Sequence, residues 1–196
     1  MNLLGAEGTL TRRYDDRIAA TAWARQMIAD PAGWVLLDTE TTGLSGSDEV
    51  IQVGVLAPDG KIVFNSLVRP ALVTAIPEAA ARVHRIRMEH LADAPGYREI
   101  VDDLAAITAH KLVVAYNAEF DSRLLAQSAR AAGIGPLEAR WECAMKQYSR
   151  YVGDWDSSRC NYRYQRLPSA AHDAIGDCRA TLAIIRTMAM LARSRF

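Results

Sequence analysis

The sequence lacks an excess of charge of either sign. Its 196 residues include 23 Lys and Arg and 23 Asp and Glu, so the formal net charge is zero. This excludes a protein that is held on nucleic acid mainly by bulk positive charge, although it leaves room for a local basic channel. With 50% hydrophobic and 23% charged residues, the composition is that of an ordinary globular protein with one substantial core.

Long apolar runs and cysteine motifs are also missing. No apolar stretch approaches the roughly 20 residues that span a membrane, and the N-terminal segment has no apolar signal core. The three cysteines, at positions 143, 160 and 178, have no C-x-x-C spacing, which argues against a structural zinc site or a disulfide framework. We therefore expect a protein of the reducing cytoplasm that does not associate with membranes.

The hydrophobic pattern predicts an α/β fold. Strands are expected at 34–39, 49–57, 61–68, 111–115 and 141–144, with a hairpin turn at 57–60. Helices are expected at 11–30, 97–110, 118–132 and 173–193, with short helical pieces within 77–94 and irregular chain at 1–10 and 145–168. Three antiparallel strands followed by alternating helices and strands imply a mixed sheet flanked by helices. We divide the chain into an N-terminal helical extension, 1–33, packed on a domain at 34–196.

Two carboxylates stand together at the end of the first predicted strand. The apolar run from Trp34 to Leu37 leads directly into Asp38 and Glu40. Because side chains two residues apart in a strand share a face, these two acids point the same way. Two adjacent buried carboxylates are costly unless a cation or a shared proton compensates them, and Mg²⁺ is a cation that prefers such oxygen ligands. The alternative is a strand end at which both acids reach water.

Two further acids and a histidine follow at element boundaries. Asp121 comes just after the strand that ends near Tyr116, where α/β folds often place functional groups; the alternative is an acid favoured by the helix dipole. Asp177 shares an apolar face of the last helix and therefore needs a partner. His172 precedes it by five residues and is either a functional group or a capping residue. Asp173 is better explained as a helix-start residue.

Taken together and in this order, these segments resemble the DEDDh (DnaQ-like) branch of the 3′-to-5′ exonuclease superfamily, which includes the proofreading epsilon subunit of bacterial DNA polymerase III, ribonuclease T and oligoribonuclease. D-T-E-T-T-G-L at 38–44 is similar to the first motif, N-A-E-F-D at 117–121 to the second and H-x4-D at 172–177 to the third. V-H-R-I at 83–86 and E-H-L at 89–91 resemble a segment of the epsilon-like members. One departure is Tyr116, where many relatives carry His.

The resemblance implies a ribonuclease-H-like fold and a site with two divalent cations, Mg²⁺ or the Mn²⁺ that replaces it. It assigns the metal ligands to Asp38, Glu40, Asp121 and Asp177, and the general base to His172. This agrees with the chemistry, because two metals can stabilise both the attacking and the leaving oxygen in phosphodiester hydrolysis, and an imidazole titrates near neutral pH. The activity implied is removal of nucleoside 5′-monophosphates from single-stranded DNA or RNA 3′ ends.

Substrate contacts are implied by the same resemblance. The candidates are Thr41, Gly43, Leu44, His84, Asn117 and Phe120, with Leu44 placed against the terminal base and Phe120 either at the base or in the core. Basic and aromatic residues alternate through 140–166, a composition suited to a single-strand groove; the alternative is a solvated loop with some aromatics in the core.

Other functions were weighed against this one. A haloacid dehalogenase-type phosphatase needs D-x-D, whereas Glu40 occupies the second acidic position. A catalytically silent nucleic-acid-binding or polymerase-docking module would not need all five catalytic positions. With no polymerase or helicase domain in the sequence, we expect the protein to act alone or with a non-covalent polymerase or repair partner. The choice between DNA and RNA and between monomer and homodimer stays open.

Overall fold

The computed structural model describes the backbone of residues 3–190 and the side chains of residues 13–190, and its centre is a five-stranded mixed sheet. The strands are β1 Trp34–Thr41, β2 Val50–Leu56, β3 Ile62–Leu67, β4 Leu112–Ala115 and β5 Arg140–Cys143, in the order β3-β2-β1-β4-β5. The first three pair antiparallel, and β4 and β5 run parallel to β1. The predicted mixed sheet is confirmed.

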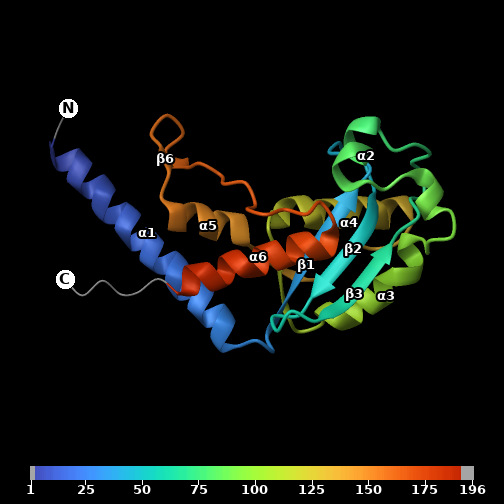
Figure 1. Cartoon of the computed structure of the whole chain (residues 1–196), viewed down its shortest axis with the longest axis horizontal. Coiled ribbons are helices and arrows are strands. Elements are labelled where there is room, and N and C mark those ends of the chain that lie inside the picture. Colours follow the sequence, from blue (N-terminus) through green and yellow to red (C-terminus); the bar gives the residue numbers. More distant parts are fainter. Residues whose placement is uncertain (1–2, 191–196) are drawn as a thin grey trace.

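Helices cover both faces of this sheet (Figure 1). They are α1 Leu3–Ala29, α2 Glu78–His84, the 3-10 helix η1 Met88–Leu91, α3 Tyr97–Thr108, α4 Ala118–Ala131, α5 Ala144–Val152 and α6 Ala174–Ala189. α3 and α4 pack on one face, and α6 packs on the other. α1 and α5 lie against α6 and extend away from the sheet. None of the helices in the described part of the chain has the length and hydrophobicity of a membrane span.

The alternation of side chains along β1 joins the two halves of the core. Val35 and Leu37 belong to the cluster on the α3 and α4 face, whereas Trp34 and Leu36 belong to the cluster under α6. Since strand side chains alternate between faces, Asp38 and Glu40 continue the row of Trp34 and Leu36 toward α6. The strand that anchors the core therefore also presents the two acids.

The expectation of irregular chain at 145–168 is wrong. This segment contains α5 and a short hairpin, β6 Trp155–Asp156 with β7 Asn161–Tyr162. α5 ends at Val152 and is capped by Gly153, which has a left-handed φ of 78° that glycine adopts without strain. Tyr148 and Tyr151 lie three residues apart and pack on the α6 cluster, so an amphipathic helix underlies what reads as a loop rich in aromatic and basic residues.

The N-terminal helix also begins earlier than predicted. Residues 1–10 were expected to be irregular, but α1 starts at Leu3. The two glycines at positions 5 and 8, and the absence of a clear helical period there, hide this start in the sequence. The predicted end of the last helix at residue 193 lies outside the described residues, and the division at residue 33 stays a prediction.

Candidate active site

Four carboxylates predicted from the sequence face one cleft. Asp38 and Glu40 on β1 and Asp177 on α6 each offer an oxygen, and these oxygens all lie within 4.8 Å of one another. Asp121, in the first turn of α4, lines the same cleft of about 660 Å³ together with His172. Three separate elements thus bring together acids that are 139 positions apart at the extremes.

Asp121 is held in the cleft by a neighbour of the two strand acids. The Thr39 hydroxyl donates a hydrogen bond of 2.8 Å to Asp121 Oδ1, and both side chains are buried. Because Thr39 lies between Asp38 and Glu40 in β1, its side chain points to the α4 face. β1 therefore presents Asp38 and Glu40 on one face and, through Thr39 on its other face, orients Asp121.

A glycine in β2 lets α6 approach the sheet closely enough to deliver Asp177. Gly54 pairs with Asp38 across the β1–β2 ladder. A Cβ on Gly54 would lie 2.9 Å from both the carbonyl carbon and the Cβ of Ala174, the first residue of α6. Real Cβ atoms do not approach other atoms so closely, so only glycine fits unless the helix moves. The Ala174 N–H also donates to Gln52 Oε1 at 3.3 Å, which fixes the helix start over the strand.

The electrostatics of the cleft favour a bound cation. Burial, together with the charges of Asp121 and Asp177, raises the pKa of Asp38 well above its ordinary value. Burial and the charge of Asp177 raise the pKa of Glu40 to about 8. Burial raises the pKa of Asp121 to about 7, although the hydrogen bond from Thr39 opposes this rise. Protons or divalent cations relieve this repulsion, and a cluster of carboxylate oxygens is the donor set that Mg²⁺ and Mn²⁺ take.

The loop that carries His172 is held by Asp177. Asp177 Oδ1 accepts hydrogen bonds from the backbone N–H of Ala171 at 2.7 Å and of His172 at 3.1 Å. His172 and Ser169 both have left-handed φ angles, 56° and 59°, which cost non-glycine residues energy and are typical of functional loops. The histidine thus sits at the exposed rim of the cleft, on a strained loop fixed by one of the acids.

The predicted role of Asp173 as a helix-start residue is confirmed. Asp173 is the N-cap of α6, and its Oδ1 accepts a hydrogen bond of 2.9 Å from the N–H of Gly176. Its carboxylate is therefore occupied with the helix end, and Asp177, one turn later, is the acid that joins Asp38 and Glu40.

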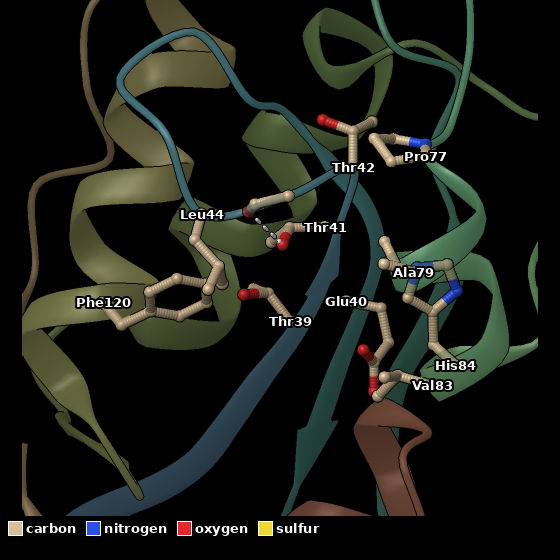
Figure 2. A pocket seen from close by; sticks show the side chains of 12 residues that line it. Thr39, Glu40, Thr41, Thr42, Leu44, Pro77, Ala79, Val83, His84 and Phe120 are labelled. Atoms are coloured by element: carbon tan, nitrogen blue, oxygen red, sulfur yellow. Dashed lines mark hydrogen bonds between the residues drawn. The ribbon is translucent and has the colours of Figure 1, made fainter.

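A second pocket of about 390 Å³ adjoins the acids at the C-terminal end of β1. Figure 2 shows Leu44 and Phe120 on one side, Pro77, Ala79, Val83 and His84 on the other, and the end of β1 between them. Its lining includes five of the six candidate substrate residues, Thr41, Gly43, Leu44, His84 and Phe120. The sixth, Asn117, lines the acidic cleft. The roles of these residues in substrate binding stay predictions.

Two lining residues of the second pocket have contrasting environments. The Leu44 side chain is 78% exposed, as expected for a residue that follows a glycine in a turn. His84 is buried, its Nδ1 accepts a hydrogen bond of 3.0 Å from the N–H of Ile86, and burial lowers its pKa. A neutral imidazole in one wall and an exposed aliphatic side chain in the other suit contact with a nucleoside.

The segment 140–166 divides into residues near the cleft and residues remote from it. In the remote part, Trp155 packs edge-on against Tyr162 at 5.1 Å between ring centroids, and the Tyr162 hydroxyl donates to Asp16 of α1 at 2.8 Å. Near the cleft, Arg166 lines the acidic site, and Tyr164 lines a neighbouring pocket with Asn117. Of the hairpin aromatics, Tyr162 therefore contacts α1 and Trp155 packs on Tyr162. Beside the site, Arg166 lines the cleft, and Lys146 and Tyr164 line the neighbouring pocket.

Several residues that shape the site were missed by sequence reasoning. Thr39 and Gln52 are polar residues of ordinary strands, and nothing in their sequence context indicates their partners. Tyr116 was noted in the sequence only as a departure from the family motif; in the structure its hydroxyl donates a hydrogen bond of 2.6 Å to the carbonyl of Gln165 and so holds the cleft wall. Gly54 did carry a signal, since an isolated glycine within an apolar strand indicates the close approach of another backbone.

Comparisons with known proteins agree with this geometry. A family model described as an exonuclease, RNase T, matches residues 35–185. The uncharacterized exonuclease CP81 of Escherichia phage 186 is 33% identical over 79% of this chain and 87% of its own length. The DNA polymerase III subunit epsilon of Treponema pallidum is 28% identical over 82% of this chain and 78% of its own.

Solved structures share the fold. Exonuclease X in complex with 5′ overhanging duplex DNA superposes with a TM-score of 0.55 and 28% identity, over 81% of this chain and 94% of that one. E. coli exonuclease I in complex with a dA16 oligonucleotide gives a TM-score of 0.62 at 14% identity, over 77% of this chain and 39% of that one. The predicted ribonuclease-H-like fold is confirmed, and the phosphatase alternative has no support. The chain belongs to the RNase T exonuclease family and is a DnaQ-like 3′-to-5′ exonuclease.

Proposed function

We propose that this exonuclease removes nucleoside 5′-monophosphates from the 3′ ends of single-stranded DNA with two divalent cations and a histidine general base. The observation that carries the proposal is the convergence of Asp38, Glu40, Asp121 and Asp177 on one cleft with His172 at its rim. The choice of DNA rests on the structural neighbours, since exonuclease X was solved in complex with 5′ overhanging duplex DNA and exonuclease I in complex with a dA16 oligonucleotide. A polymerase partner and a cytoplasmic location stay predictions.

The four carboxylates are the residues that would hold the cations. Asp38 lies centrally among them, because the negative charges of Asp121, Asp177 and Glu40 all act on its pKa, so it would hold a cation together with the other three acids. When bound, two Mg²⁺ or Mn²⁺ ions neutralise the charge on the reacting phosphate and lower the pKa of a water molecule. Four ionised carboxylates balance two divalent charges, which removes the repulsion present in the metal-free cleft.

His172 is assigned to proton transfer. Its imidazole lies at the open edge of the cleft, where solvent water has access, and an imidazole ring nitrogen can accept a proton from such a water. In hydrolysis the ring takes the proton from the attacking water as the new P–O bond forms. The bond from phosphorus to the 3′ oxygen of the preceding nucleotide breaks on the opposite side, and this oxygen takes up a proton from solvent. The protonated ring then returns its proton to solvent, for which the exposed position of His172 is suited.

The adjoining pocket is assigned to the terminal nucleoside. It shares Thr39, Glu40 and Phe120 with the acidic cleft, so a nucleoside within it would place its 5′ phosphate beside the four acids. Backbone groups of Thr41 to Gly43 and the side chain of Leu44 would then contact the sugar and base. The upstream strand would leave through the cleft past Asn117 and Arg166.

The experiment uses a single-stranded DNA oligonucleotide labelled at its 5′ end. With Mg²⁺, we expect a ladder that shortens one nucleotide at a time from the 3′ end, nucleoside 5′-monophosphates as products, and no reaction in EDTA. The Asp38→Asn variant is the matched inactive control, and an RNA of the same sequence tests the choice of sugar. Internal cleavage, or binding without turnover by the wild-type protein, would overturn the proposal, and faster cleavage of the RNA would overturn its DNA assignment.

A further inference from the structure

The turn that carries Leu44 is fixed by two side chains of α4 and by Asp48 of the same loop. The Ser45 carbonyl accepts hydrogen bonds from Gln127 Nε2 at 3.0 Å and from the Arg123 guanidinium at 3.3 Å, both on α4. The Ser45 N–H donates to Asp48 Oδ2 at 2.6 Å, just before β2. Both backbone polar groups of Ser45, its N–H and its carbonyl, are therefore held by hydrogen bonds.

Arg123 also contacts the ring of Phe120, the residue that faces Leu44 (Figure 2). Its guanidinium carbon lies 5.3 Å from the centroid of the Phe120 ring, within the range of a cation–π contact. The same guanidinium donates to Gln127 Oε1 at 3.0 Å, and Gln127 is 8% exposed. Figure 2 shows the Leu44 side chain directed toward the Phe120 ring. One arginine thus touches both the ring and the turn that form this side of the pocket.

We propose that Arg123 and Gln127 are positioning residues that set the place of Leu44 relative to Phe120 and thereby determine how the enzyme holds the base of the 3′-terminal nucleotide. This inference rests on the proposed function, since it takes the pocket beside Glu40 as the terminal nucleoside site. Leu44 is 78% exposed and has little packing of its own, so its position depends on how its turn is held. A planar guanidinium is suited to this task, because it donates in fixed directions while it stacks on a ring.

A different role for Arg123 would be direct contact with a phosphate of the bound strand, because its side chain is exposed and lines a pocket with Asn117 and Lys146. The two roles differ in whether they depend on the base of the terminal nucleotide. A positioning role matters only when the terminal nucleotide has a base to hold. A phosphate contact matters equally whether or not that base is present. The chemistry of the 3′ terminus therefore separates them.

The experiment compares two 5′-labelled oligonucleotides that differ only in the terminal nucleotide, which is either normal or abasic. Steady-state kcat and KM are measured for wild type, Arg123→Ala, Arg123→Lys and Gln127→Ala. The matched control is Arg130→Ala, an exposed arginine near the end of α4 that lies outside the nucleoside pocket. Thermal unfolding and the circular dichroism of each variant verify that the fold is intact.

We expect Arg123→Ala and Gln127→Ala to lower kcat/KM roughly 10-fold on the normal terminus, mainly through KM, and to match wild type within about twofold on the abasic terminus. Lysine should restore part of the loss, since it donates to one acceptor but does not form the planar fork. In a Leu44→Ala background, Arg123→Ala should add little further loss, because both changes disturb the same contact.

The failure of this inference is distinguishable from that of the proposed function. If wild type shortens both oligonucleotides but Arg123→Ala slows both equally, Arg123 contacts the phosphate backbone and the positioning role is wrong. If the losses in the Leu44→Ala background are additive, the two side chains act independently and the inference is also wrong. If wild type shortens neither oligonucleotide, the proposed function itself fails.

Discussion

The carboxylate of Asp177 accepts a hydrogen bond from the backbone N–H of His172 at 3.1 Å. The residue that completes the acidic group of the cleft therefore also fixes the loop from which the imidazole reaches the rim. The proposed metal ligand and the proposed proton acceptor are thus linked through the backbone of residues five positions apart in the sequence. In the metal-free protein the two functions of Asp177 can be separated by substitution.

The first prediction concerns His172. We expect His172→Ala to lower the single-turnover rate of nucleotide release roughly 10²- to 10⁴-fold, because no other neutral base stands at the rim among the described residues that line the cleft. Divalent-metal affinity, measured by calorimetry with Mn²⁺, should stay near wild type, since the four carboxylates are unchanged. His110→Ala, an exposed histidine before β4, is the control. An unchanged rate in His172→Ala would remove this residue from the mechanism.

The second prediction separates the two functions of Asp177. Asp177→Asn keeps an oxygen that can accept from the N–H groups of Ala171 and His172, but it loses the charge. Asp177→Ala loses both. We expect both variants to bind Mn²⁺ weakly and to be inactive. Only the alanine variant should in addition lose metal-free stability, by up to about 1 kcal/mol for each of the two solvent-exposed hydrogen bonds. The His172 amide resonance should keep its position in the asparagine variant alone. Identical resonances in both variants would show that the carboxylate does not hold the loop.

The third prediction concerns pH and metal removal at Glu40. Its pKa in the folded protein is about 8, against an ordinary value of 4.5. A carboxylate whose pKa is raised by folding stabilises the fold below its ordinary pKa, and this stability is lost as pH rises through the folded pKa. In EDTA, the wild-type protein should therefore lose stability between about pH 5 and pH 8 relative to a Glu40→Gln variant.

The measurement is the melting temperature of both proteins against pH, with EDTA or with Mg²⁺. At pH 8 in EDTA we expect Glu40→Gln to melt more than about 4 °C above wild type, and Mg²⁺ to remove or reverse the difference. The exposed Glu138, changed to Gln, is the control. A constant offset between wild type and Glu40→Gln across this pH range would mean that the cleft does not strain its carboxylates.

The five strands of the sheet and the four acids that line the cleft could be predicted from sequence, the strands from local patterns and the acids from these patterns together with the family motifs. The apolar run before Asp38 predicts β1, and the sharp turn at 57–60 predicts the pairing of β2 with β3, which the ladder confirms. The prediction of which residues face one another across the cleft rested on the order and spacing of the family motifs. Asp121 and Asp177 both reach the cleft that Asp38 lines, as predicted.

What could not be predicted depends on contacts between distant segments. The hydrogen bond from Thr39 to Asp121 joins residues 82 positions apart, and no local pattern distinguishes Thr39 from a structural strand threonine. α5 was missed because the face that packs on the core is made of tyrosines, which in the sequence are equally typical of an exposed segment. In the structure α1 and α6 cover this face. Gly54 did carry a local signal, but its consequence for Asp177 requires the tertiary structure.

The fourth prediction follows from Gly54. In Gly54→Ala the added methyl group would lie 2.9 Å from the backbone of Ala174, so the start of α6 must move away from β2. We expect a destabilisation of about 1–3 kcal/mol and, because Asp177 moves with the helix, weaker Mn²⁺ binding and a lower kcat although no acid is altered. Gly135→Ala is the control, since a Cβ there meets nothing within 4 Å. Loss of stability with unchanged metal affinity would show that Gly54 does not position Asp177.

The last prediction divides the arginines of the 140–166 segment. Arg159 and Arg163 lie within 3.9 Å of the hairpin carboxylates Asp156 and Asp154, whereas the exposed Arg166 lines the acidic cleft and follows Gln165, which Tyr116 holds. If the strand leaves through the cleft, Arg166→Ala should raise KM for single-stranded DNA and reduce the slope of log KM against log salt by about 0.7, the value for one lost phosphate contact.

The double variant Arg159→Ala with Arg163→Ala serves as its control, and its salt slope should stay within experimental error of wild type because ion pairs on the hairpin already occupy these side chains. The kinetics are measured with one oligonucleotide at several concentrations of potassium chloride and a fixed excess of Mg²⁺. A salt slope that falls in the double variant but not in Arg166→Ala would place the strand along the hairpin, and the exit past Asn117 would then be wrong.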